Sequence, residues 1–209
     1  MTHPSIVDAD SWASARAELL LAEKEATRLV DRVAARRRRL PMVPMSDSYV
    51  FDTPGGPRTL IELFEGRSQL VAYRFMDVGP DEFCPGCTWF TDNVPAQGIA
   101  NLAKHDIAWI TISDMPLAQL AARAAERGWT IPIASSHGTT YGADLDAGPG
   151  FQLTVFLALD GVVYKTYSTT ARGVDRLVFA NSLQDLLPFG RQEDWEDSPD
   201  GWPQRPTYG

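Results

Sequence analysis

Cysteine is scarce in this chain, and so are the features that mark secreted or membrane-spanning proteins. Two cysteines among 209 residues cannot build the disulfide framework on which small secreted domains depend. No segment approaches the roughly 18 consecutive apolar residues of a membrane span. The N-terminal letters MTHPSIVDAD lack the basic and apolar parts of a secretory signal. The sequence therefore predicts a cytoplasmic protein that has no membrane partner.

Positive charge is also in deficit. The chain carries 19 basic and 27 acidic residues, a formal net charge of −8, which repels nucleic acid phosphates and anionic membranes alike. The one dense cluster of cations, Arg36 to Arg39, ends a helical pattern before Pro41, where basic side chains complement the carbonyl end of a helix. We therefore expect no nucleic acid among the partners of this protein.

Histidine is rare, which limits the possible metal sites. His3, His105 and His137 do not show the spacing of paired ligands, and the two cysteines would need two further ligands to hold zinc. The sequence also contains no phosphate loop, no nucleotide-binding fingerprint and no Ser/His/Asp order. We predict no metal and no cofactor.

A long helical pattern occupies the N-terminal part of the chain. Between Asp10 and Arg39, the residues Trp12, Leu19, Ala26 and Val33 recur at seven-residue spacing. Such an apolar stripe indicates a helix that packs against another surface, which is either its own domain or a second copy of the chain. We predict a homodimer that forms through this helix.

The middle of the chain alternates between strand and helix patterns. In order, we expect an extended pair of segments with a Pro/Gly turn at 49–60, a buried strand at 68–76, a kinked helix after the cysteines, a strand at 106–113, a helix at 115–128, two strands around the LDG turn at 151–169, and a final helix from about Val174 to Leu187. Hydrophobic residues make up 44% of the chain, enough for one sizeable core.

A βαβ unit followed by a β-hairpin and a closing helix is the plan of a thioredoxin-like domain. We therefore predict an α/β fold with a thioredoxin-like central sheet flanked by helices over residues 41–190. A long helical extension precedes it at 1–40. The remaining segment, 191–209, is acidic and rich in proline, so we expect an irregular C-terminal tail pinned by Trp195 or Trp202.

Both cysteines lie in the stretch DEFCPGCTWF, as Cys84 and Cys87 of a CPGC motif. The order of elements puts this motif where the first core strand leads into a helix. Free backbone N–H groups and the helix dipole stabilise a thiolate there, which lowers the pKa of Cys84 from about 8.5 towards neutrality. Cys84 is thus the candidate nucleophile. Cys87, one helical turn further on, is the candidate resolving thiol.

The residues around the cysteines also affect this chemistry. Pro85 suits the first helical turn, where no N–H group is needed, and Gly86 lets a bulky disulfide approach the backbone. In the opposite direction, the carboxylates of Asp77, Asp81 and Glu82 disfavour a thiolate and should keep its stabilisation modest.

Five ordered pieces of the sequence, EKEATRLVDRVAARRRRLP, GRSQLVAYRFM, CPGC, YKTYSTTARG and LLPFGRQED, resemble a bacterial family of predicted dithiol-disulfide oxidoreductases (domain of unknown function 899). The resemblance implies a thioredoxin-like fold with Cys84 and Cys87 as the redox pair. Its partner would be a protein or small-molecule disulfide or dithiol. Two departures exist: family members often have His where this chain has Arg74, and Leu153 stands before Thr154 where thioredoxins place a cis-proline.

Two other functions remain open. A thioredoxin-like binding module could keep the cysteine pair only as packing, because a free cysteine often behaves as a small hydrophobic residue. A peroxiredoxin-type peroxidase is the other enzymatic reading, although it would need Thr where this chain has Asp81. For the oxidoreductase we expect weak substrate contacts from Pro85, Gly86, Arg74, Thr154 and Arg172. The polar loops SSHGTTYG and YSTTARG add His137, Tyr141 and Arg172 as pocket candidates, although surface turn chemistry explains these loops at least as well.

Overall fold

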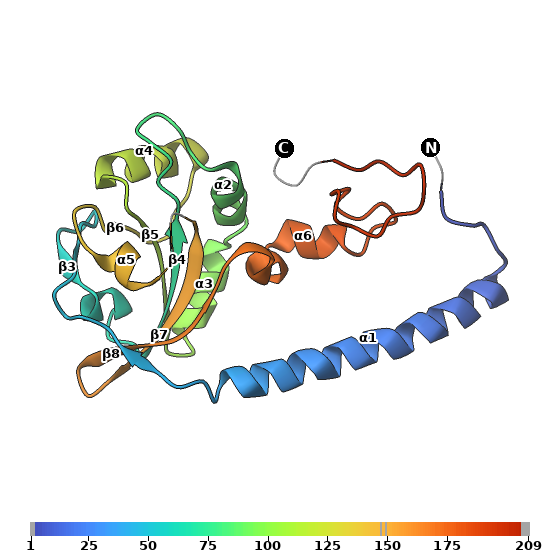
Figure 1. Ribbon diagram of the computed structural model, residues 1–209, viewed down its shortest axis with the longest axis horizontal. Helices are drawn as coiled ribbons and strands as arrows, with labels where there is room; N and C mark the ends of the chain where they lie inside the picture. The colour runs from blue at the N-terminus through green and yellow to red at the C-terminus, as the bar shows by residue number, and fades with distance from the viewer. Residues whose placement is uncertain (1–2, 147, 149, 206–209) are drawn as a thin grey trace. The chain divides into compact units, whose positions relative to one another are not determined.

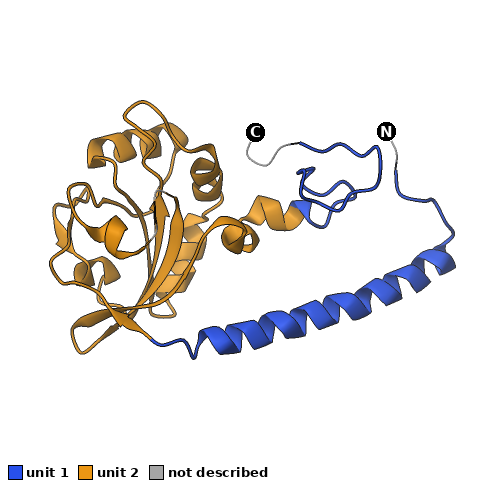
Figure 2. Cartoon of the chain, viewed as in Figure 1, with its two compact units in different colours: residues 1–41, 184–207, 209 blue, residues 42–183, 208 orange. Residues whose placement is uncertain are grey.

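The computed structural model describes residues 3–146, 148 and 150–205. This part of the chain divides into two compact units (Figure 2). One unit holds residues 42–183, and the described part of the other holds residues 3–41 and 184–205. The cysteine pair belongs to the first.

Among the described residues of the larger unit, six strands form one mixed sheet (Figure 1). The strands are β1 (Val43–Pro44), β4 (Gln69–Phe75), β5 (Ile107–Ser113), β6 (Ile133–Ser135), β7 (Gln152–Leu159) and β8 (Val162–Thr169). They lie in the order β1-β8-β7-β4-β5-β6. Strands β4, β5 and β6 run parallel, whereas β7 is antiparallel to β4 and β8 is antiparallel to β7. A separate hairpin pairs β2 (Val50–Phe51) with β3 (Arg58–Thr59).

Helices and 3₁₀ turns connect these strands. They are η1 (Ile61–Phe64), α2 (Pro85–Asp92), α3 (Ala96–Ala103), α4 (Leu117–Arg127), α5 (Tyr141–Asp144), η2 (Ala171–Leu177) and α6 (Phe179–Gln184). Helix α4 ends at Gly128, whose left-handed backbone (φ 68°) suits glycine because it has no Cβ.

Two hydrophobic clusters cover the two faces of the sheet, because successive side chains of a strand point to opposite faces. Leu70 and Ala72 of β4 join the cluster that includes Tyr141 of α5. Tyr73 and Phe75 join the other cluster, which holds Cys87 of α2 together with residues of α4 and η2. The cysteine motif is therefore packed on one face of the sheet only.

The structure confirms the predicted fold class. The sheet contains the βαβ unit β4-α2/α3-β5 and the hairpin β7-β8, arranged side by side as β8-β7-β4-β5, which is the thioredoxin-like order. The predicted strands at 68–76, 106–113 and 151–169 and the helix at 115–128 are all present. The extended pair predicted at 49–60 forms the β2/β3 hairpin.

Four local features differ from the predictions. The prediction of a single final helix is wrong, because this segment forms a 3₁₀ turn and a short α-helix. Val178 separates the two: its backbone is extended (φ −87°, ψ 112°) and its side chain is buried in the core. The kinked helix after the cysteines is two helices, α2 and α3, with Pro95 at the N-cap of the second. The short strands β1 and β6 were not predicted. Strand β6 pairs with β5, and Ser135 exchanges two backbone hydrogen bonds of 2.8 and 2.9 Å with Asp52.

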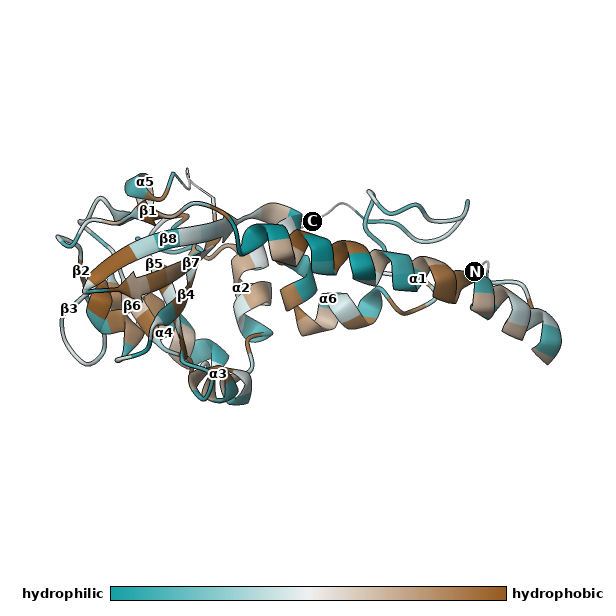
Figure 3. Cartoon of the chain, turned by 90° about the horizontal axis from the view of Figure 1, so that it is seen from below, coloured by the Kyte–Doolittle hydropathy of each residue, from teal (hydrophilic) through white to brown (hydrophobic). Residues whose placement is uncertain are grey.

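The smaller unit contains helix α1 (Ala9–Arg37), which confirms the long N-terminal helix. The side chain of Asp8 caps it by accepting a hydrogen bond of 2.8 Å from the N–H group of Ser11. Hydrophobic and hydrophilic bands alternate along α1 (Figure 3). No helix in the described part of the chain is both long and apolar enough to cross a membrane.

The described part of the tail has no regular helix or strand beyond Gln184, apart from a bridge between Glu193 and Arg205. The ring of Trp202 packs edge-on against Phe189, with 5.0 Å between the centroids, and Arg191 lies over the ring of Trp195. Both tryptophans therefore have aromatic or cationic contacts within the tail itself.

Candidate functional site

The CPGC motif forms the start of helix α2. Cys84 is the N-cap residue and Pro85 occupies the first helical turn, a position where proline loses no hydrogen bond. The sulfur of Cys84 accepts a hydrogen bond of 3.2 Å from the backbone N–H of Cys87. As predicted, strand β4 is followed by a helix that begins at these cysteines, and residues 76–84 connect the strand to the helix.

The two thiols differ in exposure. Cys84 is partly exposed, whereas Cys87 is completely buried, and the two are not joined by a disulfide. The sulfur of Cys87 lies 3.5 Å from the backbone N–H of Met76, which donates to it. One sulfur can therefore meet an external molecule, and the other lies behind it in the core.

The environment lowers the pKa of Cys84 to about 6. The largest cause is the hydrogen bond from the Cys87 thiol to the Cys84 thiolate, and backbone N–H groups of Cys87 and Gly86 add to it, whereas burial opposes it. The shift is larger than the neighbouring carboxylates led us to expect. The same hydrogen bond and burial raise the pKa of Cys87, because ionising this thiol removes the donor and places a second charge in the core.

Helix α4 holds the loop that leads into the motif. The side-chain amide of Gln119 donates 2.8 Å to the carbonyl of Gly79, and the guanidinium of Arg123 lies 4.6 Å from the ring centroid of Phe83. Arg123 also donates to the hydroxyl of Thr88 on α2, at 3.3 Å. Sequence reasoning missed these contacts, because they join residues 35 to 40 positions apart and no local pattern marks them.

A crevice of about 20 Å³ lies beside the motif. Gly86 and Trp89 of α2 line it together with Tyr73 of β4, Phe151 and residues of η2 and α6. The ring of Tyr73 is stacked on Phe90, with 4.0 Å between the centroids. This crevice gives the CPGC turn an aromatic flank.

Two hydrogen bonds join α2 and its C-cap residue to α6 beside this crevice. The indole N–H of Trp89 donates 2.9 Å to the side-chain oxygen of Asn181, and the backbone N–H of Ala180 donates 3.1 Å to Asn93. Trp89 nevertheless stays 44% exposed. It therefore presents an apolar surface next to the CPGC motif, a feature that the sequence alone does not reveal.

The other predicted contact residues lie on different parts of the fold. Arg74 and Thr154 belong to the sheet face opposite Cys87, because Arg74 alternates with Tyr73 along β4 and Thr154 pairs with Ala72. Thr154 is buried and donates 2.9 Å to the side chain of Gln152. Arg172 is 62% exposed in η2, with its Nε atom 3.7 Å from the carboxylate of Asp175.

The loop residues His137 and Tyr141 do not form a pocket with Arg172. Tyr141 is 1% exposed and packs in the core on the α5 face, whereas Val174 of η2 packs in the core on the other face. His137 is exposed, and its Nδ1 atom lies 3.0 Å from the carbonyl oxygen of Asp114. Tyr141 is therefore a core residue rather than a surface contact.

Within residues 3–146, 148 and 150–205, no three His, Cys, Asp or Glu side chains gather as a metal site would require. The two free cysteines can supply the chemistry of sulfur. A partly exposed, acidic thiol can attack a disulfide, and a buried thiol in the same helical turn can attack the product.

Solved structures with similar chain paths include three bacterial proteins. A cysteine-to-serine mutant of PrxQ from Xylella fastidiosa is 10% identical, with a TM-score of 0.45, covering 68% of this chain and 94% of that one. The peroxidoxin BcpB from Mycobacterium tuberculosis is 17% identical, with a TM-score of 0.44 over 64% and 86%. A secreted disulfide oxidoreductase from Mycobacterium tuberculosis is 13% identical, with a TM-score of 0.40 over 62% and 91%.

No curated protein matches the sequence. A family model, in contrast, matches almost the whole chain, over residues 1–208. This match confirms the resemblance that the five sequence pieces suggested. The chain belongs to the family described as bacterial protein of unknown function (DUF899).

Proposed function

We propose that this protein is a thiol-disulfide oxidoreductase in which Cys84 is the nucleophile and Cys87 the resolving thiol. The observation that carries the proposal is the pairing of a partly exposed thiol, whose pKa is about 6, with a completely buried thiol in the same helical turn. At neutral pH most Cys84 is then thiolate, the form that attacks disulfides.

The reaction balances over two exchange steps. The Cys84 thiolate attacks one sulfur of a substrate disulfide, so a mixed disulfide forms and the first substrate thiolate leaves. Cys87 then loses its proton and attacks the sulfur of Cys84, which releases the second substrate thiolate and leaves a Cys84–Cys87 disulfide. The substrate gains two electrons and the protein loses two. An external dithiol restores the reduced pair, and the same steps in reverse oxidise a dithiol.

The substrate would dock along the CPGC turn. Pro85 and Gly86 leave the backbone accessible, and Trp89 and Phe151 offer an apolar flank beside them. Arg172 would supply a cation at the exposed side of η2. Thr154 would act indirectly, through strand β7, which begins directly after Phe151. We place this chemistry in the cytoplasm, where thiols are kept reduced and a paired CxxC is more often catalytic than structural.

A redox titration tests the proposal. We expect the wild-type protein, equilibrated in glutathione or dithiothreitol buffers, to change between a form that takes two alkylating groups and a form that takes none. Gel shift after alkylation measures the ratio. The Cys84→Ser variant is the matched control and should take one group in every buffer. A wild type that keeps two free thiols in glutathione disulfide and in mild peroxide would contradict the proposal and favour a binding module.

We further propose that the protein is a homodimer joined through α1. The helix carries exposed apolar residues, among them Trp12, Leu19 and Leu29, and burying them against a second copy removes apolar surface from water. Sedimentation velocity at about 20 µM, within the usual assay range, should show a dimer. The double variant Leu19→Lys, Leu29→Lys should sediment as a monomer, and the control Lys24→Ala should not. A monomeric wild type would refute the dimer.

A further inference from the structure

We propose that Arg74 is a positioning residue that holds the backbone before strand β7 in place beside the CPGC turn. This inference rests on the proposed disulfide exchange and adds to it the part of the chain that sets the substrate side of the crevice. Arg74 lies near the end of β4, on the sheet face opposite Cys87, so it acts on the site through the backbone that it binds.

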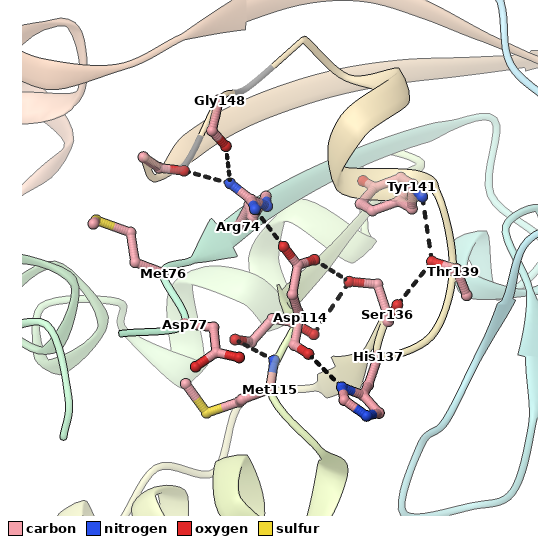
Figure 4. Close-up of polar contacts among 12 residues, drawn as sticks. Arg74, Met76, Asp77, Asp114, Met115, Ser136, His137, Thr139, Tyr141 and Gly148 are labelled. Carbon is pink, nitrogen blue, oxygen red and sulfur yellow. Dashed lines mark hydrogen bonds and ion pairs between the residues drawn. The ribbon is translucent and has the colours of Figure 1, made fainter. Parts of the chain in front are cut away.

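The guanidinium of Arg74 bonds directly to the segment that enters β7. Its Nη1 atom donates 3.1 Å to the carbonyl of Gly148 and also donates to the carbonyl of Gly150. Its Nη2 atom forms an ion pair with Asp114, just after β5. Figure 4 shows Arg74 between the carbonyl of Gly148 and the carboxylate of Asp114. One side chain therefore connects the carboxyl ends of two parallel strands to the entry of a third.

Asp114 is itself held in place. The hydroxyl of Ser136 donates 2.6 Å to the Oδ1 atom of Asp114, and Ser136 follows strand β6. The Arg74 side chain is only 9% exposed, so moving it would leave a buried charge or an unpaired carboxylate. The guanidinium thus has one strongly favoured position, which suits a group that must fix a backbone.

The surrounding chain leaves room for this ion pair at Gly142 of α5. A Cβ atom at that position would lie 2.9 Å from the Oδ2 atom of Asp114 and 3.1 Å from the Nε atom of Arg74. These distances are shorter than ordinary contacts, so a larger residue would displace the pair. Gly142 therefore offers a way to disturb Arg74 without removing its charge.

Phe151 connects the anchored backbone to the redox motif. It follows Gly150 directly, lies 6.0 Å from Tyr73 between ring centroids and lines the same crevice as Gly86. Its carbonyl accepts a hydrogen bond of 2.7 Å from the hydroxyl of Thr170. If Gly150 lost its hydrogen bond to Arg74, the backbone on one side of Phe151 would no longer be held. The ring of Phe151 would then lose its fixed position in the surface on which a bulky disulfide docks. The pKa of Cys84 should stay low, because the hydrogen bonds that lower it all come from residues of α2.

The rate of insulin reduction depends on docking, whereas the rate of alkylation by iodoacetamide depends only on the thiol, so the two rates together distinguish a docking defect from a thiol defect. Fully reduced protein is mixed with insulin, whose disulfides need docking, and separately with iodoacetamide, which is small and needs none. We expect Arg74→Met and Gly142→Ala to lower the single-turnover rate with insulin by about tenfold or more, as a misplaced binding surface does. The alkylation rate and its pH midpoint should remain within about twofold of wild type. The insulin rate of Arg74→Lys should lie between those of wild type and Arg74→Met, because an ammonium keeps the charge but lacks the planar fork of donors of a guanidinium.

The control is Arg67→Met, which removes a surface ion pair of 2.9 Å with Glu65 and should change neither rate. If folded Arg74→Met and Gly142→Ala reduce insulin as fast as wild type does, the inference is wrong. It is also wrong if the rates of insulin reduction and of alkylation fall by the same factor. If Arg74→Met does not fold, Gly142→Ala decides. If wild type reduces no disulfide, the proposed function fails, and hydrogen exchange still tests the anchor: the amides of Phe151 and Gln152 should exchange faster in the variants, and unchanged exchange would refute it.

Discussion

Cys87→Ser should yield a protein that forms a mixed disulfide and cannot release it, whereas Cys84→Ser should form none. The remaining sulfur of the first variant is the partly exposed Cys84, while that of the second is the buried Cys87. A buried thiol, whose pKa is still raised by burial when Cys84 is absent, has neither the access nor the charge to attack. Non-reducing gels and mass spectrometry of both variants purified from cells would reveal the adducts.

Both variants must be folded for this comparison to decide the roles of the two cysteines. Serine keeps the shape of cysteine but places a more polar group in the core, which costs about 1 to 2 kcal/mol at the buried position 87. Thermal unfolding should therefore show a small loss for Cys87→Ser and a smaller one for Cys84→Ser. If neither folded variant carries an adduct, the assignment of nucleophile and resolving thiol is wrong.

The rate of Cys84 alkylation by iodoacetamide should rise with pH around a midpoint of about 6. Below that pH the thiol is protonated and the rate should drop about tenfold per pH unit, since only the thiolate reacts. The Cys87→Ala variant should have a higher midpoint, because alanine has no group to donate the largest stabilising hydrogen bond. A wild-type rate that stays flat up to pH 8 would support a binding module with an inert cysteine pair.

The same pKa shifts make the stability of the reduced protein depend on pH. Cys84 has a lowered pKa when folded, so its contribution is complete above the unfolded value of about 8.5 and is lost as the pH falls through about 6. Cys87 has a raised pKa, so its contribution is complete below about 8.5 and is lost above it. Denaturant unfolding of the reduced wild type, compared with the two serine variants, should therefore give the largest stability difference near pH 8.5.

Local sequence patterns predicted most of the fold and the position of the cysteines. Strands β4 and β5 are apolar runs, the LDG turn marks the β7/β8 hairpin, and CPGC follows the first core strand. Each of these signals lies within a few residues of the structure that it predicts. The roles of Pro85 at the first helical turn and Cys84 at its cap follow from the same local logic.

The surroundings of the site could not be predicted in this way. The hydrogen bond of Trp89 to Asn181 joins residues 92 positions apart, and Arg74 binds Gly150 across 76 positions. The prediction of one final helix was wrong for a related reason, because burial of Val178 in the core outweighs the helical pattern of its neighbours. Tertiary packing decides such features, and a single sequence does not reveal it.

The short outer strands of the sheet bear on how the protein avoids uncontrolled self-association. An exposed edge strand can recruit another chain through its free N–H and C=O groups, which leads to aggregates. Here one edge is β1, two residues long and ending in Pro44, which has no N–H group to offer. At the other edge, β6 has three residues, and Ser135 is already bonded to Asp52. Each of these edge strands therefore offers few free backbone groups with which another strand could pair.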